Sequence, residues 1–87
     1  MHKESWLVRK DRILAMRFFQ DKISDEDGTL YMRVHYASCE RGFLRGVTPH
    51  VDLYASERMG FEIARELWRS SLETDWEVSE KPLWLTS

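Results

Sequence analysis

Cysteine is almost absent from this 87-residue chain, as are long apolar runs and any large excess of one charge. The single cysteine, Cys39, cannot form a disulfide within the chain, whereas a small secreted domain usually carries several. No apolar run approaches the roughly 18–20 residues that a membrane span needs. Residues 1–9 also lack the apolar stretch of a secretory signal. These absences predict a soluble protein with a cytoplasmic location.

Charge is nearly balanced, with 13 basic and 15 acidic residues and a net charge of -2. This balance argues against a protein held to nucleic acid by its net charge, although it leaves a local basic patch open. Aromatic residues are abundant by contrast, because four Trp, three Tyr and four Phe supply enough apolar surface for one compact core. The length leaves room for one domain over residues 1–87 and not for two.

Three segments of the N-terminal half have the composition and alternation of strands. Residues 6–9 predict a short strand, residues 12–20 a longer one, and residues 29–37 the most regular one. Helix is an alternative for residues 12–20, because Leu, Ala and Met are good helix formers, but neither a cap nor a polar face accompanies them. The acidic segment 21–28 predicts a loop that joins the two longer strands as an antiparallel pair, and it lacks the residue spacing of a calcium loop.

A helix over about residues 57–73 is predicted by an apolar stripe at helical spacing. Ser56 is suited to cap its first turn, because a serine hydroxyl can accept a hydrogen bond from the amides that the helix leaves unpaired. Arg58 and Glu62 stand four residues apart on the polar face, which is the spacing of an ion pair along a helix. Residues 51–54 form either a short fourth strand or an extended lead into this helix.

The predicted fold is α+β, with a three- or four-stranded, mainly antiparallel sheet and one long C-terminal helix packed on one face. The extension 75–87 carries two tryptophans and is expected to dock against the body of the domain, while Trp6 and Trp76 seal the edges of the core. The predicted core takes its members from the inner face of the two longer strands and from the helix stripe: Leu14, Met16, Phe18, Leu30, Met32, Val34, Phe61, Ala64, Leu67, Trp68 and Leu72.

Short motifs at the two ends of the chain resemble those of a known family. They are Trp6-Leu7, Arg17-Phe18, and the run from Ala64 to Trp68 (Ala-Arg-Glu-Leu-Trp) followed by Trp76. The pattern is similar to a family of small uncharacterised cyanobacterial proteins, a domain of unknown function, although Asp75 stands where that pattern has glycine. The resemblance implies a small α+β fold and a cyanobacterial source, and it brings no catalytic residue with it.

The sharpest functional hypothesis concerns the sheet face that the helix leaves open. Tyr31, Arg33 and His35 alternate along one strand, and Arg17 and Phe19 fall on the matching face of its neighbour. Cations interleaved with aromatic rings on an open sheet are typical of single-stranded nucleic-acid binding. They also serve simply to stabilise an exposed sheet. With two arginines of the following loop, the candidate binding surface comprises Arg17, Phe19, Tyr31, Arg33, His35, Arg41 and Arg45.

A protein-interaction or adapter role is the main functional prediction. If Ile13, Ala15, Phe19 and Tyr31 lie on the open face, the patch is apolar enough to need a protein partner, and a symmetric homodimer would bury it. Single-stranded nucleic-acid binding through Tyr31 and its neighbours is the alternative.

Catalytic chemistry finds little support in the sequence. Cys39, His35 and His50 are the natural candidates for a thiol or zinc site, but no Cys-x-x-Cys or His-Glu-x-x-His motif accompanies them. The acidic residues cluster in segment 21–28 and on the polar face of the predicted helix, where solvated charges ordinarily lie. We therefore predict a protein that is not an enzyme, with no catalytic residues, no cofactor and no metal.

Overall fold

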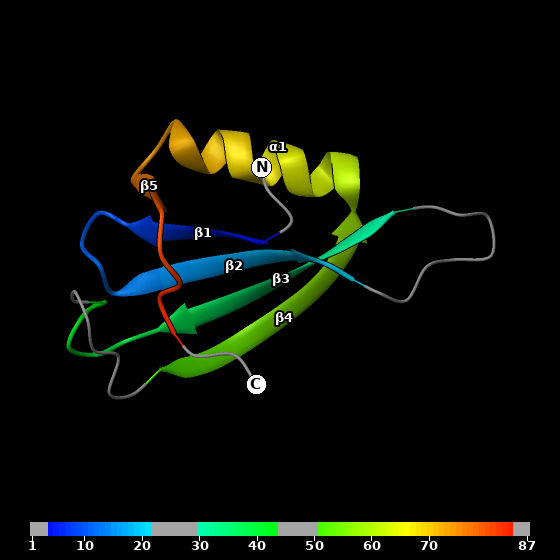
Figure 1. The fold of residues 1–87 in the computed structure, drawn as a ribbon. Helices are drawn as coiled ribbons and strands as arrows, with labels where there is room; N and C mark the ends of the chain where they lie inside the picture. Colours follow the sequence, from blue (N-terminus) through cyan, green and yellow to red (C-terminus); the bar gives the residue numbers. More distant parts are fainter. Residues whose placement is uncertain (1–3, 22–29, 44–50, 85–87) are drawn as a thin grey trace.

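The computed structural model describes residues 4–21, 30–43 and 51–84. In chain order they form β1 (Glu4–Arg9), β2 (Leu14–Gln20), β3 (Tyr31–Ser38), β4 (Asp52–Gly60), α1 (Phe61–Leu72) and β5 (Trp76–Ser79). The strands make one five-stranded sheet in the order β4-β3-β2-β1-β5, with antiparallel neighbours throughout (Figure 1). The α+β class is therefore confirmed, with more strands than the sequence predicts.

A tight turn that begins at Lys10 and Asp11 joins β1 to β2. The Asp11 carboxylate accepts a hydrogen bond from the backbone N–H of Ile13 at 2.9 Å, and Arg12 takes a φ of 63°. This left-handed backbone is unusual for a residue with a side chain. The Arg12 Nε donates to the Phe43 carbonyl at 2.6 Å, which ties the turn to the segment after β3.

The second half of the chain departs most from the sequence prediction. The short strand expected at 51–54 continues to Gly60, and the helix begins at Phe61 and has 12 residues. Ser56 is not the helix cap, because Gly60 holds that position without a side-chain hydrogen bond. Pairing between residues 52–60 and β3 supplies a ladder of backbone hydrogen bonds, and this tertiary pairing overrides the local helical signal. Arg58 consequently lies on β4, where it forms an ion pair with Asp21 and not the predicted helical pair with Glu62.

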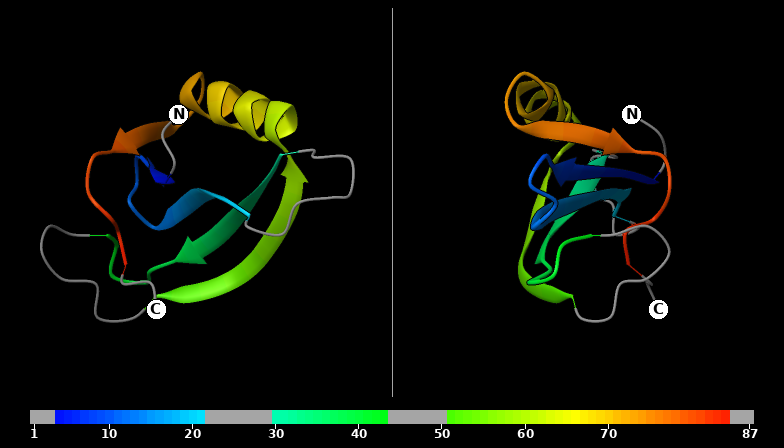
Figure 2. Two further views of the ribbon diagram at one scale, coloured as in Figure 1. Left: turned by 45° about the vertical axis from the view of Figure 1, so that its right-hand side comes forward. Right: turned by 90° about the vertical axis from the view of Figure 1, so that its left-hand side faces the viewer.

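The helix is also not the last element, because β5 follows it and pairs with β1. The chain then doubles back across the sheet on the side opposite to α1, as the two views of Figure 2 show. This return places Trp84 against Trp6 in an edge-to-face contact, with ring centroids 4.5 Å apart. The expected docking of the C-terminal extension is thus observed for its described part, residues 75–84.

Each face of the sheet consequently has its own apolar cluster. On the helix side, α1 covers the part of the sheet around Phe18, whose ring meets Trp68 edge to face at 5.3 Å. On the outer side, the segment after β3 and the returning C-terminal segment cover Ala15 and Val8. The buried members of the helix-side cluster are Leu7, Met16, Phe18, Met32, Val34 and Ala64, and those of the outer cluster are Trp6, Val8, Ala15, Ala37, Cys39, Phe43, Leu83 and Trp84.

Several core assignments made from the sequence are wrong. Leu30 is 57% exposed, and Phe61 and Leu72 are also exposed, because the helix starts four residues later than predicted and covers less of the sheet. Trp6 does not seal an edge, because β1 lies between β2 and β5 and Trp6 is a buried member of the outer cluster. Phe43 is wholly buried although no sequence pattern placed it in the core.

Candidate functional site

The five candidate residues on the two central strands lie together on the outer face. The register pairs Arg17 with His35 and Phe19 with Arg33, and Tyr31 stands two residues before Arg33 on the same face of β3. Two residues of β4 join them, because Ser56 pairs with His35 and Arg58 with Arg33. We call these seven residues the outer-face cluster: Arg17, Phe19, Tyr31, Arg33, His35, Ser56 and Arg58.

Arg17 occupies one side of the cluster and is held by rings and a carboxylate. Its guanidinium carbon lies 4.0 Å from the centroid of the Phe19 ring and 5.6 Å from that of Trp6. Its Nη2 lies 2.6 Å from the Glu4 carboxylate, to which it donates. The planar guanidinium thus stacks on an aromatic face while its N–H groups hold the carboxylate.

Arg33 and Arg58 occupy the other side and converge on one carboxylate. Each places a guanidinium nitrogen 3.3 Å from Oδ2 of Asp21, whose side chain is only 9% exposed. Arg33 also donates to the Ser56 hydroxyl at 3.0 Å. Arg58 lies over Tyr31, with its guanidinium carbon 3.9 Å from the ring centroid.

His35 lies between the two sides of the cluster. Its ring meets Phe19 edge to face, with centroids 4.8 Å apart. Partial burial lowers the pKa of His35 below its ordinary value of 6.5, and the charges of Arg17 and Arg33 lower it further. The imidazole is therefore mainly neutral at pH 7, and the cationic groups of the cluster at that pH are its arginines.

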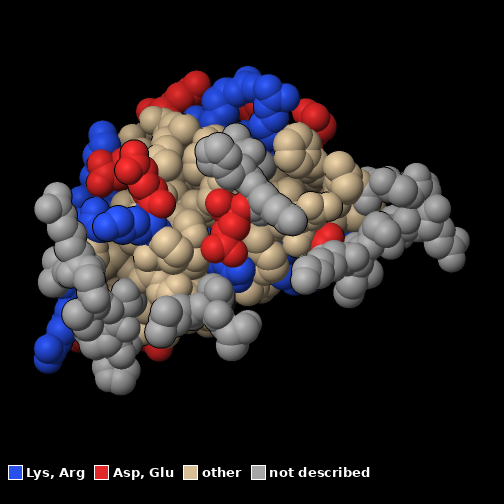
Figure 3. Space-filling model, in the orientation of Figure 1, with Lys and Arg blue, Asp and Glu red and all other residues tan. Residues whose placement is uncertain are grey.

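The cluster is close to electrical balance, because three guanidinium groups face two carboxylates. Viewed from this side, basic and acidic residues lie beside one another and do not form one broad patch of a single sign (Figure 3). The rings of Phe19 and Tyr31 each carry an arginine on one face. The arrangement therefore stabilises the sheet through internal pairs, and it offers less stacking surface than the sequence suggests.

The remaining predicted surface residues do not join this cluster. Arg41 is exposed in the turn after β3, and Arg45 lies outside the described residues. The apolar patch expected on the open face is also wrong at Ala15, which is fully buried as a member of the outer cluster. Sequence reasoning missed Ser56 and Arg58 because it assigned them to the helix and its cap. The sequence feature that could have placed them on a strand is Gly60, because a helix that begins after this glycine leaves Ser56 and Arg58 outside it.

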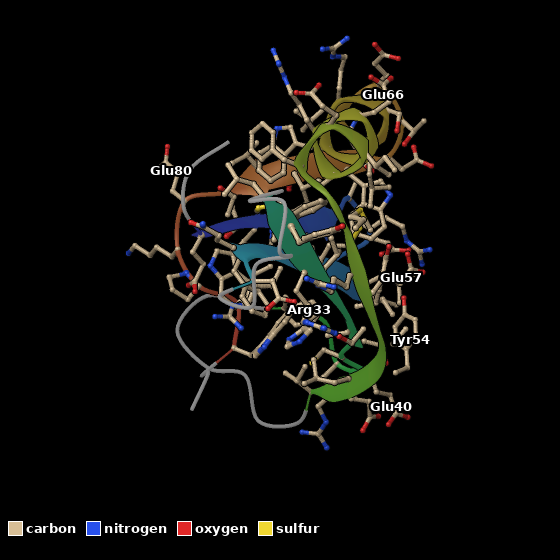
Figure 4. The ribbon with its side chains drawn as sticks, turned by 90° about the vertical axis from the view of Figure 1, so that its right-hand side faces the viewer. Arg33, Glu40, Tyr54, Glu57, Glu66 and Glu80 are labelled. Atoms are coloured by element: carbon tan, nitrogen blue, oxygen red, sulfur yellow. The ribbon has the colours of Figure 1, made fainter. Side chains whose placement is uncertain are left out.

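The second surface of interest is the border of the sheet formed by β4. Residues 52–58 are all exposed, and β4 pairs with β3 alone among the described strands. Leu53 and Tyr54 are 55% and 56% exposed at a point where the register between β3 and β4 shifts. In Figure 4, Arg33 lies on one side of the β4 ribbon, whereas Tyr54 and Glu57 lie on the other. The strand therefore presents side chains on both sides of an open edge.

The direction of the backbone groups along β4 follows from one hydrogen bond. The Phe61 N–H donates to the Leu30 carbonyl at 3.2 Å. Hydrogen-bonded and non-bonded residue pairs alternate along antiparallel strands. The pairs of Met59 and Glu57 with β3 are accordingly hydrogen-bonded. Arg58, which stands between them, and Ser56, which precedes Glu57, direct their N–H and C=O groups away from β3.

Among the described residues, Cys39 and His35 make contacts with other groups and not with each other. Cys39 is buried and donates to the Gly42 carbonyl at 3.2 Å, whereas His35 lies on the outer face and His50 lies outside the described residues. Within residues 4–21, 30–43 and 51–84, no three His, Cys, Asp or Glu side chains gather as a metal site would require. In the same residues, α1 is too short and too polar to cross a membrane.

The chain matches a family model in the comparison with known proteins. A family model described as "Protein of unknown function (DUF1651)" matches residues 4–83. No curated protein and no solved structure matches the chain. The matched segment includes all five strands and the helix, so it takes in both surfaces described above.

Proposed function

Because the chain belongs to the DUF1651 family, whose function is unknown, we propose from its geometry that it is a protein-binding module whose β4 edge pairs with an extended strand. The observation that carries the proposal is the edge itself. β4 has nine residues, is hydrogen-bonded on one side by β3, and is exposed from residue 52 to residue 58. Such an edge is a template for another strand.

Natural sheets usually protect an edge of this length with proline, with charged side chains and above all lysine, with a covering element or with a bulge. β4 contains neither proline nor lysine. Its irregularity lies opposite Tyr36 and Ala37, so the half from Ala55 to Gly60 pairs regularly with β3. Because this half pairs regularly with β3, it can accept a further strand on its other side. The backbone N–H and C=O of Ser56 point toward that side.

The side chains beside the edge supply a basis for selectivity. In strand addition, backbone hydrogen bonds give affinity, while the side chains on either face select the partner. Tyr54 contacts Tyr36 on the helix side, with ring centroids 6.3 Å apart, so an aromatic surface lies next to the edge. Arg58 places a cation on the outer side, whereas Glu57 places an anion on the helix side. We expect partners with an apolar residue near Tyr54 and with charges that complement these two.

The proposal is tested by selecting extended peptides from a displayed library and measuring their affinity for three forms of the protein. Ser56→Pro removes the outward N–H without removing a bond to β3, because proline has no amide hydrogen. Ser56→Ala is the matched control, since it loses the same hydroxyl contact with Arg33 and keeps the N–H. We expect Ser56→Pro to weaken binding roughly tenfold, as the loss of a backbone hydrogen bond would, while Ser56→Ala stays within about twofold.

Hydrogen exchange supplies the second readout of this experiment. A selected peptide should slow the exchange of the Ser56 amide in the unsubstituted protein. A library that returns no binder contradicts the proposal, and so do peptides that bind Ser56→Pro and the unsubstituted protein equally.

Single-stranded nucleic-acid binding by the outer-face cluster is the second candidate function. The position of Arg17, Phe19, Tyr31, Arg33 and His35 on one face of adjacent central strands favours it. The internal ion pairs with Glu4 and Asp21 weigh against it, because phosphate would have to compete with both carboxylates. Titration with a single-stranded oligonucleotide at low salt tests it, and amide shifts that do not move at Tyr31 or Arg33 would exclude it.

Two expectations from the sequence accompany these candidates as predictions. They are a cyanobacterial source and a cytoplasmic location.

A further inference from the structure

We infer that the strand which pairs with β4 is β4 of a second copy of this chain, antiparallel to the first and centred on Ser56. The inference rests on the proposed function and specifies its partner. A two-fold axis brings the same surface of both copies together, so two identical edges meet in antiparallel orientation. The result is a continuous ten-stranded sheet, counting the five strands of each copy.

The hydrogen-bonding pattern limits the registers that such a pair can adopt. Ser56 and Arg58, two residues further on, direct their backbone groups outward. Each outward-directed residue of one copy must therefore face an outward-directed residue of the other copy. This condition is met only when the two-fold axis passes between a residue and the same residue of the other copy. Within the regular half of β4 and its border, the axis can pass through Ala55, Ser56, Glu57 or Arg58.

Charge and strand geometry distinguish these registers. An axis at Glu57 sets two carboxylates directly opposite each other, and an axis at Arg58 does the same with two guanidinium groups, both of which are unfavourable across a strand pair. An axis at Ala55 relies on residues 52–54, where the register with β3 shifts. An axis at Ser56 sets no like charges opposite each other, and it pairs the regular residues 55–57 of the two copies with one another while Arg58 faces Tyr54.

The register centred on Ser56 also places complementary groups together. Ala55 of one copy faces Glu57 of the other, so a small side chain leaves room for the carboxylate. Glu57 and Tyr54 lie on the same side of β4 (Figure 4), and the tyrosine hydroxyl of one copy can donate to the carboxylate of the other. The two Ser56 hydroxyls face each other on the outer side, next to the Arg33 groups that donate to them.

The interface is small, because one strand from each copy makes most of its contacts. Interfaces below about 1,200 Å² usually belong to weak or transient complexes. We therefore expect a reversible dimer that forms in the micromolar range or above, seen as a rise in sedimentation coefficient with concentration.

Sedimentation velocity from about 10 μM to 1 mM tests the inference with two substitutions at one position. In the inferred register, Ala55→Glu sets glutamate against Glu57 twice per dimer, and Ala55→Lys sets lysine against it twice. From the size of cross-strand charge pairs, we expect dissociation to become roughly threefold to tenfold easier with Ala55→Glu and harder with Ala55→Lys. Ser56→Pro should abolish the dimer, and Ser56→Ala should keep it.

Each outcome of this experiment decides the matter. A protein that stays monomeric to 1 mM overturns the inference, as does a dimer that Ser56→Pro leaves intact or one on which both Ala55 variants act alike. If circular dichroism shows that Ser56→Pro does not fold, the difference in dimer affinity between Ala55→Glu and Ala55→Lys still tests the inference. A monomer that nevertheless binds selected peptides through the Ser56 amide refutes the dimer and leaves the proposed function standing.

Discussion

The guanidinium of Arg58 lies over the ring of Tyr31, with its carbon 3.9 Å from the ring centroid. This contact joins β4 to β3 on the outer face, in the half of β4 that pairs regularly. A cation over an aromatic face at such a partly exposed site contributes about 0.5–1 kcal/mol. The stability of the β4 edge therefore depends in part on a residue that the sequence assigned to a helix.

Replacement of Arg58 by alanine should lower the free energy of unfolding by about 1 kcal/mol, because both the ring contact and the ion pair with Asp21 are lost. Arg69→Ala is the matched control, since Arg69 is exposed on α1 and its ion pair with Glu66 is 3.8 Å long. Urea unfolding followed by circular dichroism measures both. Equal effects of the two substitutions would mean that the contact with Tyr31 contributes nothing.

Trp84→Ala should be among the most damaging substitutions. The side chain is 7% exposed and packs edge to face on Trp6, so its removal leaves a large cavity in the outer cluster. Truncation of a buried aromatic residue costs about 3–5 kcal/mol. Val78→Ala, at an exposed position of β5, should destabilise the protein much less. The melting temperatures of the two variants measure this difference. A Trp84→Ala protein that melts with the unsubstituted one would contradict the packing described for the C-terminal segment.

Gly42→Ala should destabilise the protein by about 1–2 kcal/mol, the cost of holding an L-residue in the left-handed region. Gly42 has a φ of +83°, and an added Cβ would lie 3.4 Å from the Arg12 carbonyl oxygen. Gly60→Ala is the control, because its backbone is extended and a Cβ there meets nothing within 4 Å. We expect the Gly60 variant to be the more stable in urea, and the reverse order would be inconsistent with the turn geometry.

Stability should fall as the pH is lowered through about 6.5, because of His35. Its folded pKa lies below the ordinary value of 6.5, so the unfolded chain takes up the proton first as the solution becomes acidic. The loss begins near the unfolded pKa and ends below the folded one.

The measurement is urea unfolding at several pH values between 7.5 and 5.5, for the unsubstituted protein and for His35→Gln. The variant should show the shallower dependence on pH, and the contributions of His2 and His50 cancel in the comparison. Identical slopes would show that neither burial nor the neighbouring arginines disfavour the imidazolium.

The sequence was informative where structure is set locally. Alternation along β2 and β3 placed Met16, Phe18, Met32 and Val34 in the core, since a period of two is fixed by strand geometry alone. The same alternation brought Arg17 and His35 to one face, and the register between the strands then set them opposite each other.

Features that depend on contacts distant in sequence could not be predicted in this way. Ser56 followed by Glu57 satisfies the local rules for a helix start, and only the pairing with β3 makes these residues a strand. Phe43 and Trp84 lie in segments without any periodicity, so their burial follows from where the chain returns. The open β4 edge was missed for the same reason, because its existence depends on where the helix begins.

The position of β1 has a consequence for the order in which the protein is synthesised. One side of β1 pairs with β2, which follows immediately, but its other side pairs with β5, at the far end of the described chain. Until that segment leaves the ribosome, the emerging chain carries β1 as an unprotected border rich in apolar residues. Nascent chains of this kind are prone to aggregate. We expect newly made chains to bind chaperones until residues 76–79 have emerged and paired with β1.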